Sequence, residues 1–292
     1  MDEVDLHIHS TCSDGTLTPR EVVGLAKSTG LRAVALTDHD TVAGVGEALA
    51  AGEELGIEVV AGVEVSAACP AGSLHILGYY LSTTHRELVG ALNRLQDGRA
   101  VRAPKIVERL RSLGLDITLA EVMDVSGGQV GRAHVAQALV KRGYVATADE
   151  AFSRYLGRGR PGYVDRVRLS PEEVIGVIRE AGGLAALAHP STLALDRPSG
   201  LSAVVARLKA MGLEAIEVFS PYHTREMTRI YEEISRGQGL LCTGGSDFHG
   251  GMSDHGDLGG TRLGLHFPYA LLDGLKMRIA ARERRSGRGI GP

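Results

Sequence analysis

The chain has 292 residues, of which 43% are hydrophobic and 23% are charged. This composition is typical of soluble globular proteins and excludes a mainly disordered chain or a coiled coil. The formal net charge is −3. No run of 18 apolar residues occurs, and the N-terminus lacks a basic flank followed by an apolar stretch, so the sequence predicts neither a membrane span nor a secretory signal. We therefore expect a cytoplasmic protein.

The charge is unevenly distributed along the chain. Residues 98–168 contain 13 Lys and Arg against 7 Asp and Glu, so this segment carries +6 while the remainder carries −9. Such a segment is suited to face an anion, and the alternative is a solvated helical surface. Trp is absent and only four Phe occur, so stacking platforms for single-stranded nucleic acid are sparse.

Seven short apolar or β-branched runs predict strands, and amphipathic segments lie between several of them. The predicted strands are residues 4–8, 33–37, 58–63, 74–80, 184–188, 215–219 and 240–243. Two of the intervening segments, at 18–21 and 170–173, open with a hydroxyl side chain, a proline and a glutamate, which is typical of a capped helix start. Gly30 and Gly182 lie where these helices are expected to end. The alternation predicts an α/β fold with a parallel sheet, and its length favours a barrel or a barrel-like variant.

The middle of the chain departs from this alternation. Apolar residues recur at helical spacing from Leu88 to Leu95 and again from Ile106 to Leu113, which predicts an inserted helical subdomain. We therefore expect a catalytic barrel made of residues 1–97 and 169–283, and an insertion at 98–168 that contributes to substrate binding. Residues 284–292 are expected to form a flexible tail.

Histidines and acidic residues fall next to the ends of the predicted strands. The candidates are His7, His9, Asp14, His39, Glu64, His75, His189, Asp247 and His249. Strand ends converge on one face of a parallel α/β barrel, and imidazole with carboxylate suits Zn, Mn or Fe. Any one of these histidines could be a capping or core residue, but their shared placement predicts a multinuclear metal site. His255 and His266 do not share it and are predicted to be surface residues.

The motifs around these residues resemble a known family. They are Asp5-Leu6-His7-Ile8-His9, Thr37-Asp38-His39-Asp40, Gly62-Val63-Glu64, His75-Ile76-Leu77-Gly78, Ala188-His189-Pro190 and Gly245-Ser246-Asp247-Phe248-His249-Gly250. In this order they resemble the polymerase and histidinol phosphatase (PHP) family of metal-dependent phosphoesterases. Within the family the chain is most similar to the nucleoside 3′,5′-bisphosphate phosphatases and 5′-to-3′ exoribonucleases, which carry a helical insertion at this place.

The resemblance implies a distorted seven-stranded β/α barrel with two or three Mn, Zn, Fe or Mg ions. It implies three ligand sets, which are His7, His9, Glu64 and Asp247; Glu64, His75 and His189; and Asp14, His39 and His249. Ions of this kind activate a water molecule as hydroxide and clamp the phosphoryl oxygens. Glu64 is the natural bridge because a carboxylate spans two ions, and Ser10, Ser13 and Asp38 are expected to orient the ligands.

Substrate contacts beyond the metal ions are expected in the basic insertion. The segment Gly131-Arg132-Ala133-His134 resembles the phosphate-contacting segment of the family, so Arg132 and His134 are candidate substrate ligands. The alternative for Arg132 is a cap or ion pair of the helix that begins near it. His223 follows the sixth predicted strand and is a candidate substrate contact or proton donor, or else a loop residue. The catalytic candidates are therefore Glu64, His223 and Asp247.

The expected function is hydrolysis of a phosphate monoester by metal-activated hydroxide. The expected substrate is a small nucleotide with an additional phosphate, such as a nucleoside 3′,5′-bisphosphate, or the 5′ end of a short RNA. Three alternatives are a histidinol phosphate or other small-molecule phosphatase, an amidohydrolase, and a catalytically silent metal-binding domain. We expect neither a membrane partner nor an obligate protein partner.

Overall fold

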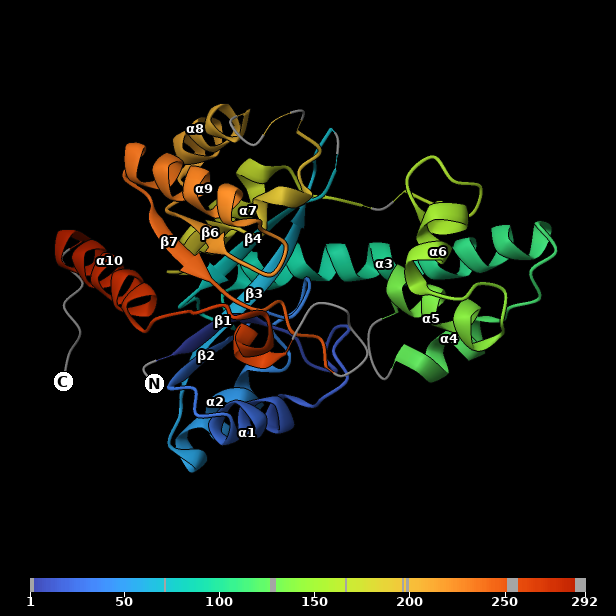
Figure 1. The fold of residues 1–292 in the computed structure, drawn as a ribbon, viewed down its shortest axis with the longest axis horizontal. Coiled ribbons are helices and arrows are strands. Elements are labelled where there is room, and N and C mark those ends of the chain that lie inside the picture. The colour runs from blue at the N-terminus through green and yellow to red at the C-terminus, as the bar shows by residue number, and fades with distance from the viewer. Residues whose placement is uncertain are drawn as a thin grey trace.

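The computed structural model describes residues 3–70, 72–126, 130–165, 167–195, 197, 200–250 and 257–286. Seven strands form one sheet whose order in space follows their order in sequence, and the sheet curves into a distorted barrel (Figure 1). The strands are β1 (Val4–Ile8), β2 (Ala33–Leu36), β3 (Glu58–Ala67), β4 (Leu74–Tyr79), β5 (Leu184–Leu187), β6 (Ala215–Phe219) and β7 (Leu241–Gly244). All seven predicted strands are confirmed. The largest difference in their ends is at β3, which continues to Ala67 instead of ending at residue 63.

The sheet is mixed because one strand runs against the others. β1, β2 and β3 pair in parallel, as do β5, β6 and β7, whereas β4 is antiparallel to both of its neighbours. The connection from β3 to β4 spans only residues 68–73, which is too short for the helical crossover that a parallel strand requires. The start of β4 therefore lies at the same end of the barrel as the C-terminal ends of the other strands.

The barrel closes just beyond the last strand. Ile8 forms an isolated parallel bridge with Phe248, and the backbone N–H of His9 donates to the carbonyl oxygen of Phe248 at 2.9 Å. A Cβ atom at Gly245 would lie 2.4 Å from Cβ of His7, so only glycine permits this close approach. The segment after β7 is thereby held against β1, and both carry histidines.

Helices cover the barrel on two sides. α1 (Pro19–Ser28) and α2 (Val45–Leu55) pack beside β1 and β2, while α7 (Pro171–Glu180), α8 (Leu201–Met211) and α9 (Arg225–Gly237) pack on the other side (Figure 1). The capping boxes predicted for α1 and α7 are confirmed, with Thr18 and Ser170 as the N-caps. Gly30 and Gly182 follow these helices with φ of 85° and 83°, the left-handed conformation expected there.

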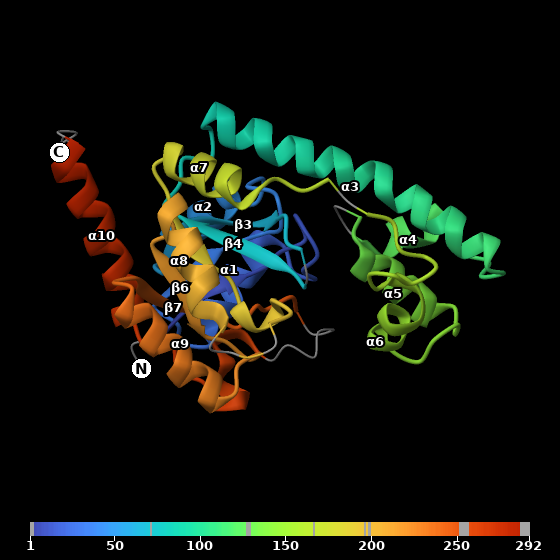
Figure 2. The same ribbon diagram turned by 90° about the horizontal axis from the view of Figure 1, so that it is seen from above.

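A separate helical subdomain lies to one side of the barrel (Figures 1 and 2). It contains α4 (Leu119–Ser126), α5 (Arg132–Lys141), α6 (Ala148–Ala151) and the π-helix η1 (Phe152–Leu156), which share their own apolar core. The 27-residue helix α3 (Arg86–Ser112) joins the two units. Its N-terminal half packs on the barrel through Leu88 and Leu95, and its C-terminal half packs on the subdomain through Ile106 and Leu110. The expected domain boundary at residue 98 thus falls inside a continuous helix.

The last described helix lies on the side of the barrel opposite the helical subdomain (Figure 1). α10 (Ala270–Ser286) buries Leu272 and Leu275 against the barrel core, which also contains Phe267. The helix includes residues 284–286, which were expected to belong to a flexible tail, and residues 287–292 lie outside the described part of the chain. Among the helices described, none has the length and apolar character needed to cross a membrane. The cytoplasmic location stays a prediction.

Candidate active site

The side chains of the predicted metal ligands meet at one end of the barrel. The reversed direction of β4 explains why His75, at the start of its strand, joins residues that follow the ends of the others. Glu64 does not end its strand as predicted but lies inside β3, because pairing with β4 extends β3 to Ala67. Glu64, His75 and Glu217 occupy the same alternating positions of their strands as core residues Val60 and Leu77, so they point to the barrel interior.

Glu64 lies at the centre of the cluster and is fully buried. Its Oε1 is 2.8 Å from Nδ1 of His75 and 2.9 Å from Nε2 of His189. Its Oε2 is 2.8 Å from Nδ1 of His39 and 3.3 Å from Nε2 of His7. The two oxygens therefore face different sets of imidazoles, which is the arrangement needed for a carboxylate that bridges two cations.

Three groups of potential ligand atoms lie close enough together to hold a cation each. They are His7, His9, Glu64 and Asp247; His9, Asp14, His39 and His249; and His39, Glu64 and His75. The first group coincides with one ligand set implied by the family resemblance, and the second contains another. The third contains His39 where the resemblance implies His189. The structure thus brings all nine predicted side chains together, while their distribution among individual ions stays a prediction.

The first group passes a physical test for cation binding. Nε2 of His7, Nε2 of His9, Oε2 of Glu64 and Oδ1 of Asp247 are all buried and make no hydrogen bond. Nε2 of His9 and Oδ1 of Asp247 are only 2.9 Å apart, but not in hydrogen-bond geometry. Burying unsatisfied polar atoms is costly, and a divalent cation among them would satisfy all four at once. Their nitrogen and oxygen donors suit Zn, Mn or Fe.

Burial and charge set the protonation states in the cluster. Burial lowers the pKa of His9 to about 3 and that of His75 to about 4, so both imidazoles are neutral near pH 7, as metal ligands must be. Burial opposes ionisation of Glu64, but the nearby histidines outweigh it and hold its pKa well below the usual value. Burial also opposes a charged His249, yet the carboxylates of Asp14 and Asp247 raise its pKa to about 10. Burial likewise opposes ionisation of Asp14 and Asp247, but nearby histidines hold their pKa values well below the usual value, so Asp14, Glu64 and Asp247 are ionised at neutral pH.

A buried acid that the sequence reasoning missed holds two of these histidines. Oε1 of Glu217 lies 2.9 Å from Nδ1 of His7, and Oε2 accepts a hydrogen bond of 2.6 Å from the backbone N–H of His189. A carboxylate behind a ligating imidazole fixes its orientation and raises its basicity. The available signal was an acidic residue in the middle of an otherwise apolar predicted strand, residues 215–219.

Two further supports hold the loops that carry the ligands. Asp38 accepts hydrogen bonds from the backbone N–H and the hydroxyl of Ser10, both at 2.7 Å, and from the hydroxyl of Ser13 at 2.6 Å. These three residues were expected to orient the ligands; they brace the loop before Asp14, and their effect on the ligands stays a prediction. The hydroxyl of Tyr222 donates to Oδ2 of Asp247 at 2.7 Å, which leaves Oδ1 facing the cluster.

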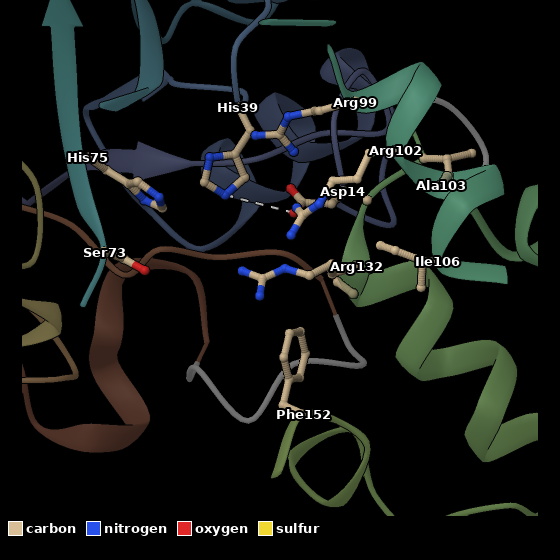
Figure 3. Close-up of a pocket in the computed structure, with 13 residues that line it drawn as sticks. Asp14, His39, Ser73, His75, Arg99, Arg102, Ala103, Ile106, Arg132 and Phe152 are labelled. Carbon is tan, nitrogen blue, oxygen red and sulfur yellow. Dashed lines mark ion pairs between the residues drawn. The ribbon is translucent and has the colours of Figure 1, made fainter. Parts of the chain in front are cut away.

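A pocket of about 190 Å³ opens between the cluster and the helical subdomain (Figure 3). Asp14, His39 and His75 line it, and so do Arg99, Arg102 and Arg132. Figure 3 shows Arg99 beside His39, and Arg132 across the pocket from His39. The sequence reasoning identified Arg132 but missed Arg99 and Arg102, because only the path of α3 brings them to the pocket.

The three arginines are anchored to different degrees. Nε of Arg99 donates to Oδ2 of Asp40 at 2.8 Å, and Nε of Arg102 donates to the carbonyl oxygen of Val164 at 2.7 Å. Arg132 donates from Nη1 to the carbonyl oxygen of Leu156 at 3.1 Å, and among the described residues no carboxylate forms an ion pair with it. Figure 3 shows its guanidinium group directed into the pocket. Arg132 is therefore a largely buried cation available to an anion.

The structure places two other candidates away from this pocket wall. His134 is 2% exposed, and its Nδ1 accepts the backbone N–H of Gly131 at 2.9 Å, so the ring caps the start of α5. His223 donates from Nδ1 to the carbonyl oxygen of Val218 at 2.8 Å, and its ring packs edge-to-face on Tyr231. Both contacts are structural, so the substrate and catalytic roles of these histidines stay predictions.

The structure describes one of the two histidines that are expected at the surface. The side chain of His266 is 74% exposed, which confirms its expected place. His255 lies outside the described residues.

Comparisons with known proteins agree with this geometry. A family model described as PHP domain matches residues 5–158. The chain is 34% identical to the 5′-3′ exoribonuclease of Haemophilus influenzae, over 84% of this chain and 89% of that relative. It is 33% identical to the 3′,5′-nucleoside bisphosphate phosphatase of Chromobacterium violaceum, over 89% of this chain and 92% of that relative. A solved structure from Bifidobacterium adolescentis, assigned to the metal-dependent phosphoesterases, superposes with a TM-score of 0.84 at 30% identity, over 94% of this chain and 96% of that one. The chain belongs to the PHP family and is a metal-dependent phosphoesterase.

Proposed function

We propose that the protein removes a phosphate from a small nucleotide that carries a second phosphate, such as a nucleoside 3′,5′-bisphosphate. The observation that carries this proposal is the pocket that three arginines line together with residues of the ligand cluster. A phosphate monoester needs the cluster alone, whereas a second anionic group accounts for Arg132, a cation of this pocket with no carboxylate partner among the described residues. The relatives named as a bisphosphate phosphatase and as an exoribonuclease support the same substrate class, including the 5′ end of a short RNA.

We assign two or three divalent ions, of Mn, Zn, Fe or Mg, to the three groups of ligand atoms. Bound there, such ions supply an activated water molecule and stabilise the charge on the phosphoryl oxygens. Glu64 is the bridging ligand in this assignment, since its two oxygens face different imidazoles. His189 completes the ligands because its Nε2 lies 2.9 Å from Oε1 of Glu64.

Other residues of the chain orient the metal ligands and bind the substrate. Glu217 and Tyr222 hold His7 and Asp247 so that their remaining donor atoms face the same point. Arg132, which has no carboxylate partner in the described part of the chain, binds the phosphate that is not hydrolysed. The helical insertion contributes to substrate binding in this way, although its core is separate from that of the barrel.

Phosphate release after metal reconstitution tests the proposal. Metal-free protein is loaded in turn with Mn²⁺, Zn²⁺, Fe²⁺ or Mg²⁺ and assayed with nucleoside 3′,5′-bisphosphates, the corresponding monophosphates, a 5′-phosphorylated oligoribonucleotide and histidinol phosphate. We expect the highest kcat/KM on a bisphosphate or the oligoribonucleotide. Faster turnover of histidinol phosphate would replace this proposal with the small-molecule phosphatase alternative. Absence of phosphate release with every metal would contradict it.

A further inference from the structure

The pocket has a third wall that phosphate recognition does not explain. Besides the ligand cluster and the arginines, five apolar side chains line it, which are Ala103, Ile106, Val130, Ala133 and Phe152. Phosphate groups gain nothing from apolar surface, and an apolar wall within a polar site is suited to the organic part of a ligand. The aromatic residue among the five is the most informative.

Phe152 is placed unlike the other phenylalanines of the chain. Phe248 and Phe267 are buried in the barrel, and Phe219 packs between two of its apolar cores. Phe152 is half-buried: it packs on the core of the helical subdomain and also lines the pocket. Figure 3 shows its ring beneath the guanidinium group of Arg132, on the side of the pocket away from His39.

The distance between this ring and the nearest cation suits a nucleotide. The guanidinium group of Arg132 lies over the Phe152 ring, with Cζ 5.4 Å from the ring centroid, so a stacked base shares the ring with this cation. A base stacked on the ring would therefore lie beside the group that we assign to the second phosphate. Aromatic faces bind bases by stacking irrespective of base identity.

The backbone around Phe152 is shaped to hold this position. Phe152 begins the π-helix η1, and its carbonyl oxygen accepts the backbone N–H of Gly157 at 2.8 Å. A Cβ atom at Gly157 would lie 2.7 Å from the same carbonyl oxygen, so glycine is required for the turn to close. Single π-helical turns inside helical segments are frequent at functional sites.

We propose that Phe152 is a stacking platform for the base of the substrate and makes the enzyme prefer nucleotides over base-free sugar phosphates. The proposal deepens the proposed function and rests on it. It names a specificity-determining residue and not a catalytic one, since the base takes no part in the hydrolysis. It also predicts little preference among bases, because stacking is tolerant of base identity.

A kinetic comparison of matched substrates tests this role. kcat/KM is measured on a nucleoside 3′,5′-bisphosphate and on the ribose bisphosphate that lacks the base, for the wild-type enzyme and for Phe152→Leu and Phe152→Tyr. We expect Phe152→Leu to lose about 5- to 100-fold on the nucleotide, the range for loss of one stacked base, and less than about twofold on the base-free substrate. Phe152→Tyr keeps an aromatic face and should stay close to the wild-type value.

Tyr155→Leu is the matched control. Tyr155 lies in the same π-helix and packs on the same core, but it does not line the pocket. The Tyr155→Leu variant should have the same ratio of the two kcat/KM values as the wild type. Thermal denaturation of each variant reports whether the subdomain remains folded. Equal losses on both substrates in folded Phe152→Leu would overturn the proposal and assign Phe152 to packing alone.

A binding measurement separates this inference from the proposed function. Calorimetry of metal-loaded protein with a nucleoside 5′-monophosphate and with ribose 5-phosphate should give tighter binding of the nucleotide, and Phe152→Leu should remove that difference. Equal affinities in the wild-type protein would overturn the role of Phe152 even if bisphosphates are hydrolysed. If neither bisphosphate is hydrolysed, the proposed function fails, while the binding difference still decides the role of Phe152.

Discussion

The barrel side and the subdomain side of the pocket are held by different kinds of contact. On the barrel side, the candidate metal ligands are buried or half-buried, and a carboxylate lies behind one of them, as Glu217 holds His7. On the subdomain side, Arg102 and Arg132 donate to backbone carbonyl oxygens and lie against aromatic rings. A carboxylate behind a ligand suits the reacting phosphate, whose geometry must be fixed. Contacts of the second kind suit the part of the substrate that only has to be recognised.

The largest expected effect is on the barrel side, at Glu64. Glu64→Gln keeps the size of the side chain but removes the charge that faces five imidazoles. The rate of hydrolysis should fall by at least about two orders of magnitude, as for loss of a preorganised electrostatic interaction. Circular dichroism should show an intact fold. Near-normal turnover at full metal occupancy would contradict the bridging role.

Replacing a histidine of the cluster should lower the metal content of the protein, whereas replacing a histidine outside the cluster should not. His189→Ala and His249→Ala remove side chains of the cluster, so each variant should bind less metal per chain than the wild type. His266→Ala is the matched control, because its side chain is 74% exposed and pairs only with Glu3 among the described residues. Elemental analysis of the purified proteins measures the difference. The same loss in all three variants would show that the cluster does not hold the metal.

Loss of the support behind the ligands should have an intermediate effect. Glu217→Gln removes the charge behind His7 and cannot accept both of the present hydrogen bonds. We expect metal affinity to fall by about 10- to 100-fold, measured by competition with a chelator. Glu214→Gln is the control, since Glu214 pairs with Arg278 and Arg282 outside the cluster. Unchanged affinity in Glu217→Gln would reduce Glu217 to a packing residue.

The smallest expected effect concerns an exposed ion pair of the subdomain. Hydrogen bonds from Arg142 and Thr118 lower the pKa of Glu121 to about 2. Because this pKa lies below the ordinary glutamate value of about 4.5, the stabilisation is fully present above about pH 4.5 and is lost as the pH falls towards 2. At pH 7, Glu121→Gln should lower Tm by a few degrees at most, since exposed pairs contribute little. The difference between the two proteins should vanish near pH 2, and a difference that grows in acid would contradict this sign.

The sequence predicts the barrel side better than the subdomain side. Strand patterns and the histidines at strand ends follow from local alternation, so all seven strands and the meeting of all nine candidate ligands at one end of the barrel could be predicted. The direction of β4 could not be predicted from local alternation, because it depends on which strands pair. The short connection at 68–73 was the available sign that β4 is antiparallel. Arg99 and Arg102 were missed because their place in the pocket depends on how α3 crosses from the barrel to the subdomain.

The central claim is that one pocket joins a metal cluster to a second anion site, and Arg132→Ala tests it most directly. Loss of a bidentate contact to phosphate costs roughly 1.5–3 kcal/mol, so kcat/KM on a nucleoside 3′,5′-bisphosphate should fall by about 10- to 150-fold. An aryl monophosphate, which lacks the second phosphate, should change much less. The measurement is the ratio of the two kcat/KM values in the wild type and the variant. A large fall in this ratio is the predicted result, and equal losses on both substrates would place Arg132 at the reacting phosphate or in the packing of α5.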